Sequence, residues 1–105
     1  MQLTAKQIEA CEEFDRFVAR IAGEVKRMAA ERGYIADGED ERAGSRYIGV
    51  WTVDDDGCRD ERVAAVRVSN HGQRYGGPDW SFETTDSDES IARGLAAIQK
   101  IIATF

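Results

Sequence analysis

Several residue types are scarce in this chain of 105 residues, and each shortage excludes a class of structure. Proline occurs once, so the chain holds no rigid proline linker and no proline-rich ligand tract. Histidine also occurs once, at His71, which excludes a metal site built from several histidines. Cysteine occurs twice, at Cys11 and Cys58, too few residues and too widely spaced for a disulfide framework.

Long apolar runs are missing as well. No stretch approaches the roughly 20 apolar residues of a membrane-spanning helix, and residues 1–6 hold no apolar core of secretory length. We therefore expect a cytoplasmic protein that does not contact a membrane.

Basic residues are outnumbered by acidic ones. The chain has 14 Lys and Arg against 20 Asp and Glu, a formal net charge of −6, which disfavours non-specific attraction to nucleic-acid phosphates. The acid is concentrated in the connections, because residues 35–61 hold nine acidic and three basic side chains. We expect no direct nucleic-acid contact, whereas a basic protein surface would suit this charge.

The chain has the size and composition of one folded domain, which we take to cover residues 1–105. Its centre is a predicted hairpin over residues 46–68. Strand-forming residues on both sides meet at a turn that contains Asp56-Gly57, a dipeptide typical of tight hairpins. A third strand is predicted at residues 80–85, where apolar and polar side chains alternate.

A helix is predicted on each side of these strands. Thr4 and Gln7 have the spacing of a capping box, and apolar residues then recur every three or four positions over residues 4–32. Such a helix would be about 43 Å long, more than the ~26 Å expected across a domain of this size. Either it bends or breaks near Gly23, or its end projects and offers a face to a partner. The second helix follows Asp86 or Ser87 as its N-cap.

These elements predict an α+β fold in the order helix, three-stranded antiparallel sheet, helix, with both helices on one face of the sheet. Residues 34–44 lack periodicity and are interpreted as an exposed acidic loop. Residues 69–79 are rich in turn formers and form the connection between the second and third strands.

This fold leaves one face of the sheet open, and seven residues on or beside that face are candidates for a binding site. Aromatic residues and arginine are favoured as interface anchors, whereas acidic turns suit a basic partner. For the aromatic residues of the hairpin, a place in the core is the alternative interpretation. The candidates are Tyr47, Trp51, Asp54, Asp55, Asp56, Arg74 and Tyr75.

Signatures of chemistry are weak. Calcium-loop spacing fails when counted from Asp54 or from Asp37, and the glycines at residues 72–77 lack the ending of a phosphate loop. A nucleophile and base formed by Cys58 and His71 is not excluded, because the two need only meet in space. We expect no catalytic residues, no metal and no cofactor. The alternatives are a small enzyme that uses Cys58, His71 or the loop carboxylates, and a homodimeric structural or adaptor protein.

In size, acidity and single mixed α/β core, the chain resembles the small inhibitor proteins of phages and mobile elements, including anti-CRISPR proteins and nucleic-acid mimics. The resemblance covers overall character and no motif, so it transfers no functional residue. It implies a non-enzymatic, stoichiometric inhibitor that docks on the basic surface of a nucleic-acid-handling protein and blocks nucleic-acid binding.

Overall fold

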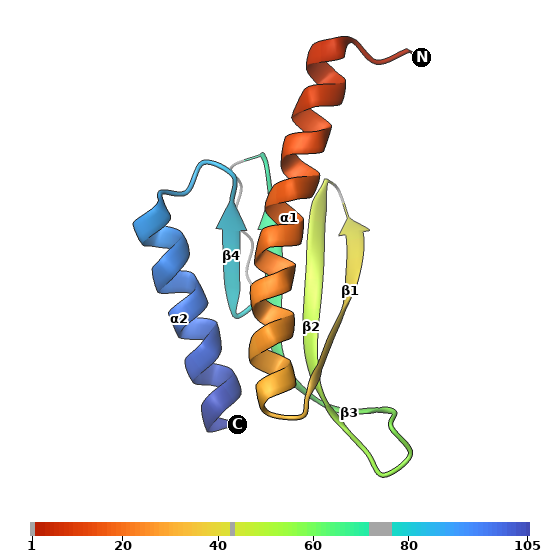
Figure 1. The fold of residues 1–105 in the computed structure, drawn as a ribbon, viewed down its shortest axis with the longest axis vertical. Coiled ribbons are helices and arrows are strands. Elements are labelled where there is room, and N and C mark those ends of the chain that lie inside the picture. Colours follow the sequence, from red (N-terminus) through yellow and green to blue (C-terminus); the bar gives the residue numbers. More distant parts are fainter. Residues whose placement is uncertain (1, 43, 72–76) are drawn as a thin grey trace.

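The fold consists of two helices and one four-stranded sheet, in a computed structural model that describes residues 2–42, 44–71 and 77–105 (Figure 1). The α+β class expected from the sequence is confirmed. In chain order the elements are α1 (Ala5–Glu31), β1 (Ile35–Arg42), β2 (Ser45–Val53), β3 (Arg59–Ser69), β4 (Trp80–Glu83) and α2 (Asp88–Thr104).

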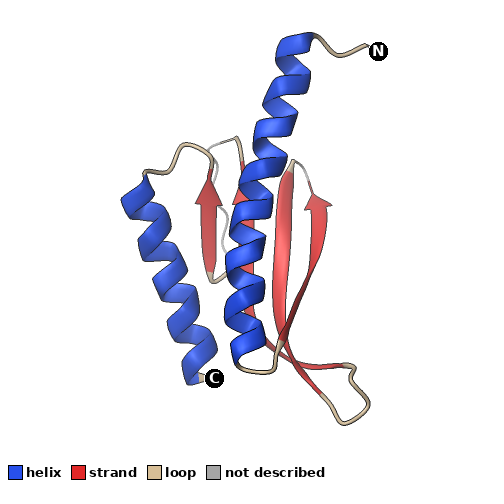
Figure 2. Ribbon diagram, viewed as in Figure 1, coloured by secondary structure: helices blue, strands red, loops and turns tan. Residues whose placement is uncertain are grey.

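The strands lie in the order β1-β2-β3-β4, and both helices cover the same face of the sheet (Figure 2). α1 packs on β1 and β2, α2 packs on β3 and β4, and the two helices contact each other. Alternate residues of the strands, among them Val50, Val66 and Phe82, are buried under the helices together with Ile21 and Ile98. A single core therefore fills the space between the two layers.

The acidic loop expected at residues 34–44 is wrong, because most of this stretch forms β1. Ile35 pairs with Trp51, and the register shifts beyond Asp37, where Gly38 has a φ of +88°. An edge strand needs hydrogen-bond partners on one side only, and charged residues are common there. β1 therefore forms without the apolar alternation by which strands are recognised in a sequence.

The expectation of three antiparallel strands is also wrong at the last strand, because β4 runs parallel to β3. Trp80 pairs with Val66 in this parallel ladder. The connection at residues 70–79 can span about 33 Å when extended, enough to return the chain to the other end of a short strand. Asp79 then fixes the start of β4, since its Oδ2 accepts from the Ala65 N–H at 2.7 Å and its N–H donates to the Ala65 carbonyl at 2.8 Å.

α1 begins with the predicted capping box. Thr4 Oγ1 accepts from the Gln7 N–H at 3.1 Å, and Gln7 Oε1 accepts from the Thr4 N–H at 2.8 Å. The sequence left open whether this helix bends or breaks near Gly23 or projects at one end. The helix continues through Gly23 without a break, and its amino-terminal end projects. Residues 2–13 are exposed, and Phe14 is the first buried residue. The molecule is consequently elongated, with a longest dimension of 48 Å.

α2 begins after Ser87, whose Oγ accepts from the Ser90 N–H at 3.1 Å. The helix approaches β4 so closely that a Cβ added at Gly94 would overlap the rings of Trp80 and Phe82. A Cβ at Gly23, in the middle of α1, would have no neighbour within 4 Å. The two helical glycines therefore differ, because only Gly94 is required by packing.

We expect alanine to have opposite effects at these two glycines. Gly94→Ala should lower the free energy of unfolding by about 1–3 kcal/mol through overpacking against β4. Gly23→Ala should raise it by about 1 kcal/mol, because alanine favours the helix and meets no neighbour. Urea denaturation of both variants measures these changes, and a stabilised Gly94→Ala variant would contradict the close packing of α2 on β4.

Candidate functional site

The face of the sheet opposite the helices, called the reverse face below, is divided into a closed half and an open half. In the closed half, over β3 and β4, Arg67, Ser69 and Glu83 are buried, and Arg67 is 0% exposed. In the open half, over β1 and β2, Tyr47 and Trp51 are only half-buried. The sequence predicted a wholly free face, and this is wrong for the closed half.

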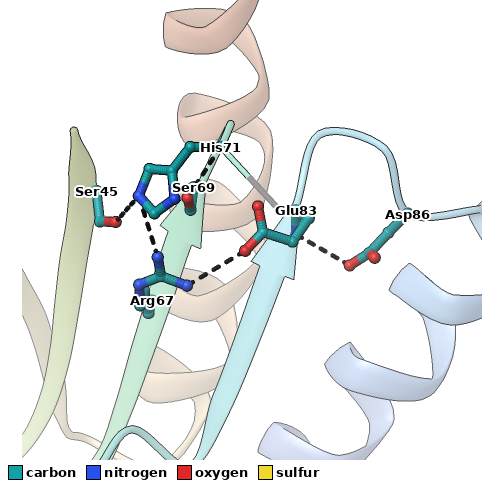
Figure 3. Close-up of polar contacts among 6 residues, drawn as sticks. All are labelled: Ser45, Arg67, Ser69, His71, Glu83 and Asp86. Atoms are coloured by element: carbon teal, nitrogen blue, oxygen red, sulfur yellow. Dashed lines mark hydrogen bonds and ion pairs between the residues drawn. The ribbon is translucent and has the colours of Figure 1, made fainter. Parts of the chain in front are cut away.

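A polar cluster fills the closed half (Figure 3). Arg67 and Glu83 form an ion pair at 3.2 Å in which neither side chain is more than 4% exposed. His71 Nε2 lies 3.1 Å from Ser45 Oγ and 3.3 Å from a terminal nitrogen of Arg67. The His71 N–H also donates to Ser69 Oγ at 3.3 Å. The cluster thus joins β2, β3 and β4 to the start of the connection that follows β3.

The chemistry of the cluster assigns a structural role to His71. A guanidinium group has donors and no acceptor, so Nε2 of His71 accepts from Arg67 and the proton of a neutral ring lies on Nδ1. The Ser45 hydroxyl can donate to the same nitrogen. The His71 side chain therefore lies against the Arg67 guanidinium on the reverse face and links the residue that follows Asn70 to β2 and β3.

Removing one partner of the buried ion pair should destabilise the protein far more than replacing both partners. Glu83→Gln should lower the free energy of unfolding by about 3–5 kcal/mol, because it removes the negative charge that lies 3.2 Å from the buried Arg67 guanidinium. The double variant Arg67→Met/Glu83→Leu should recover most of this loss, since apolar residues of similar size can replace a buried pair. Urea denaturation compares the three proteins. A double variant as unstable as the single one would contradict this role.

The hypothetical pair of Cys58 and His71 does not form. Cys58 directly precedes β3 and His71 follows its end, so an 11-residue strand separates them. At about 3.3 Å per residue the separation is on the order of 33 Å. Cys11 and Cys58 are both free and exposed. The proposed nucleophile and base are therefore at opposite ends of the sheet.

The open half contains a surface pocket of about 220 Å³. It lies over the three antiparallel strands, each of which contributes to its wall. Two of the predicted site residues, Tyr47 and Trp51, come together in this pocket. The polar and aromatic residues that line it are Asp37 of β1, Tyr47 and Trp51 of β2, and Arg59 and Arg62 of β3.

The position of Trp51 depends on Gly49. A Cβ built on Gly49 would lie 2.7 Å from Nε1 of Trp51, so the indole covers the strand at a place where only glycine leaves room. The Arg59 guanidinium stacks over the indole with its central carbon 5.3 Å from the ring centroid. The same guanidinium pairs with Asp37 at 3.3 Å. Trp51 is thereby held in one orientation while part of its ring stays exposed.

The three aspartates of the hairpin turn have different roles. Asp54 Oδ1 accepts from the N–H groups of Asp56 and Cys58 at 2.9 Å and 2.8 Å. Gly57 follows with a φ of +82°, the conformation for which glycine was expected there. Asp54 therefore stabilises the turn. The exposed carboxylates of Asp55 and Asp56 form no hydrogen bond or ion pair with another described residue. These two remain candidates for a binding surface.

Asp37, Arg59 and Arg62 line the pocket but were not predicted from the sequence as site residues. Counted regularly from the turn, Glu61 would lie opposite Trp51, but Arg62 is there because the register shifts in the ladder between β2 and β3. Thr52 Oγ1 accepts from the Glu61 N–H at 2.8 Å and so stabilises this irregularity. The other two predicted site residues, Arg74 and Tyr75, lie outside the described residues.

No group of three or more potential metal ligands occurs within residues 2–42, 44–71 and 77–105. In the same part of the chain, neither helix combines the length and the apolar character needed to cross a membrane. Comparison with known protein families finds no match, and searches of curated proteins and of solved structures find none either.

Proposed function

We propose that this protein is a non-enzymatic binding module that acts as a small stoichiometric inhibitor. It docks on a basic surface of a nucleic-acid-handling protein and blocks nucleic-acid binding there. The open half of the reverse face makes the contact. The observation that carries the proposal is the half-exposed indole of Trp51, oriented by Arg59 in a pocket on the face of the sheet opposite α1 and α2.

Trp51 has the properties of an interface anchor. Tryptophan is enriched among the residues that dominate binding energy, above all where a rigid ring lies at the centre of a contact. Here Gly49 and Arg59 fix the ring before a partner arrives, so little conformational entropy is lost on binding. Tyr47 enlarges the aromatic surface beside it.

The charged lining of the pocket itself is Asp37, Arg59 and Arg62, and the acidic hairpin turn beside it is the part that supports a basic partner. The exposed residues Asp55, Asp56, Asp60 and Glu61 follow each other closely at the end of the sheet where the β2–β3 hairpin turns. With a net charge of −6, the molecule would be attracted to a surface built to bind phosphates. The acids then guide the approach, while Trp51 supplies the affinity.

We expect Trp51→Ala to weaken binding to the target by about 30-fold, the effect of losing an anchor worth ~2 kcal/mol. Helix content should stay unchanged, because the ring lies outside the core. The measurement is a titration of purified nucleases and RNA-guided effector complexes, followed by nucleic-acid gel shift and circular dichroism. Unchanged inhibition by a folded Trp51→Ala variant would contradict the proposed face.

The acidic hairpin gives a separate prediction with a matched control. Asp55→Asn/Asp56→Asn should slow association with the target and weaken the dependence of binding on salt, since charges at the rim steer encounter. Asp88→Asn/Glu89→Gln changes the net charge equally but lies at the start of α2, and should have little effect. Association rates at two salt concentrations measure this. Equal effects of the two pairs would show that only total charge matters.

A homodimer is the outcome that would replace this proposal. If the free protein sediments as a dimer that Trp51→Ala dissociates, the open half is an interface between two copies of the chain.

A further inference from the structure

The pocket of the open half is a hollow left by a residue without a side chain. Tyr47, Gly49 and Trp51 alternate along β2, so all three are on the reverse face. Gly49 leaves a gap between the two aromatic residues, and Nε1 of Trp51 lies 2.7 Å from the place where a Cβ of Gly49 would be. The pocket has a volume of about 220 Å³, less than the roughly 300–1,000 Å³ of sites for drug-sized molecules. It therefore suits a small ligand.

Arg62 brings a positive charge to this pocket. It pairs with Trp51 in the ladder between β2 and β3, and both residues line the pocket. The Arg62 side chain is exposed and forms no ion pair or hydrogen bond with another described residue. A guanidinium group has five N–H donors and no acceptor, so a bound anion would satisfy donors that the chain itself leaves to water.

The charges that line the pocket favour a ligand with a single negative charge. Asp37 and Arg59 pair with each other at 3.3 Å and together contribute no net charge. With Arg62 the lining carries a net charge of +1, from two arginines and one aspartate. The chain as a whole carries −6, which opposes a second negative charge on the ligand. A phosphate monoester has a charge of about −1.5 to −2 at neutral pH, so the singly charged carboxylate is the better match.

The indole of Trp51 offers both a donor and an apolar wall. Its Nε1 lies over Gly49, and its N–H forms no hydrogen bond with another described residue. A carboxylate has two oxygens, one for this N–H and one for the Arg62 guanidinium. The half-buried rings of Trp51 and Tyr47 favour a planar ring beside them, because aromatic rings stack or pack edge to face.

We propose that this pocket binds a small carboxylate joined to an aromatic ring. Arg62 and the Trp51 N–H hold the carboxylate, and the ring lies between the side chains of Trp51 and Tyr47. Such a ligand is either a free aromatic acid or the carboxyl-terminal aromatic residue of a peptide, since both present the same chemistry. Binding to the pocket needs no partner protein and is therefore tested on the free chain. It stands or falls separately from inhibition of a nucleic-acid-handling protein.

Benzoate and benzamide are the probes of the first experiment, because they have the same shape and differ in charge. The isotope-labelled full chain is titrated with each while NMR follows the indole N–H signals of its two tryptophans. Benzoate should shift the signal that Trp51→Phe removes, with a Kd of about 1 mM for so small a ligand. The signal of Trp80, which packs against α2 at Gly94, should stay in place. Benzamide should bind at least tenfold more weakly. Equal binding of the two probes, or an unshifted Trp51 signal, would overturn the proposal.

Variants assign the charge to Arg62. Arg62→Gln should weaken benzoate binding at least fivefold and leave benzamide binding unchanged, which separates loss of charge from a change of shape. Arg93→Gln is the matched control, because Arg93 is also an exposed arginine but lies on α2. An equal loss of benzoate affinity in the two variants would show that only total charge matters and would overturn the proposal.

Two further probes test the single charge and the source of the ligand. Phenyl phosphate should bind more weakly than benzoate, and tighter binding would overturn a site for one negative charge. The peptide acetyl-Gly-Phe is compared with its carboxyl-terminal amide, which should bind at least tenfold more weakly. Tighter binding of the peptide acid than of benzoate identifies a peptide end as the ligand, whereas weaker binding identifies a free aromatic acid, and either result supports the carboxylate site.

Discussion

The ion pair between Arg67 and Glu83 joins β3 to the one strand that runs parallel to it, and the layered structure depends on this link. Glu83 follows Phe82 in a short strand, so fixing the carboxylate on the reverse face turns the Phe82 ring toward the helices. The Glu83 N–H also donates to Asp86 at 2.9 Å, just before α2 begins. One buried pair thus orients a core residue, the last strand and the start of the second helix.

The same pair decides how much of the reverse face is left for another molecule. A buried guanidinium must be shielded from water and needs a counter-charge, and the His71 side chain lies against it on the reverse face. Among the described side chains of the open half, no charged group is buried to this extent. Two of its charged residues, Arg59 and Asp37, form an ion pair at the surface beside Trp51. The positions of the charged residues on the strands therefore determine which half of the reverse face is buried and which half stays accessible to another molecule.

Local signals in the sequence were sufficient for the helices and the hairpin. Capping residues and helical spacing act over a few positions, and the Asp56-Gly57 turn determines which strands become neighbours. β1 could not be found in this way, because an acidic edge strand has no periodic pattern and depends on its pairing with β2. The direction of β4 likewise depends on the long-range clamp between Asp79 and Ala65.

The candidate site was predictable to a similar extent. Tyr47 and Trp51 share a face by simple alternation along a strand, and the structure places them in one pocket. Arg62 reaches that pocket only through a register shift, which no count from the turn reveals. Arg67 shares a face with Val63 and Ala65 by the same alternation, but its burial depends on Glu83, which is 16 positions away. Residues that depend on distant partners were the ones missed.

The unbroken course of α1 has a consequence for how the protein loses order. Residues 5–13 form a segment shorter than the roughly 12–15 residues at which an isolated helix becomes even marginally stable in water. Their helical state is therefore inherited from the turns packed on the sheet, beginning at Phe14. Amide hydrogen exchange should be fast at Ala5 and should become progressively slower toward Val18, because the free end can fray while the sheet stays intact.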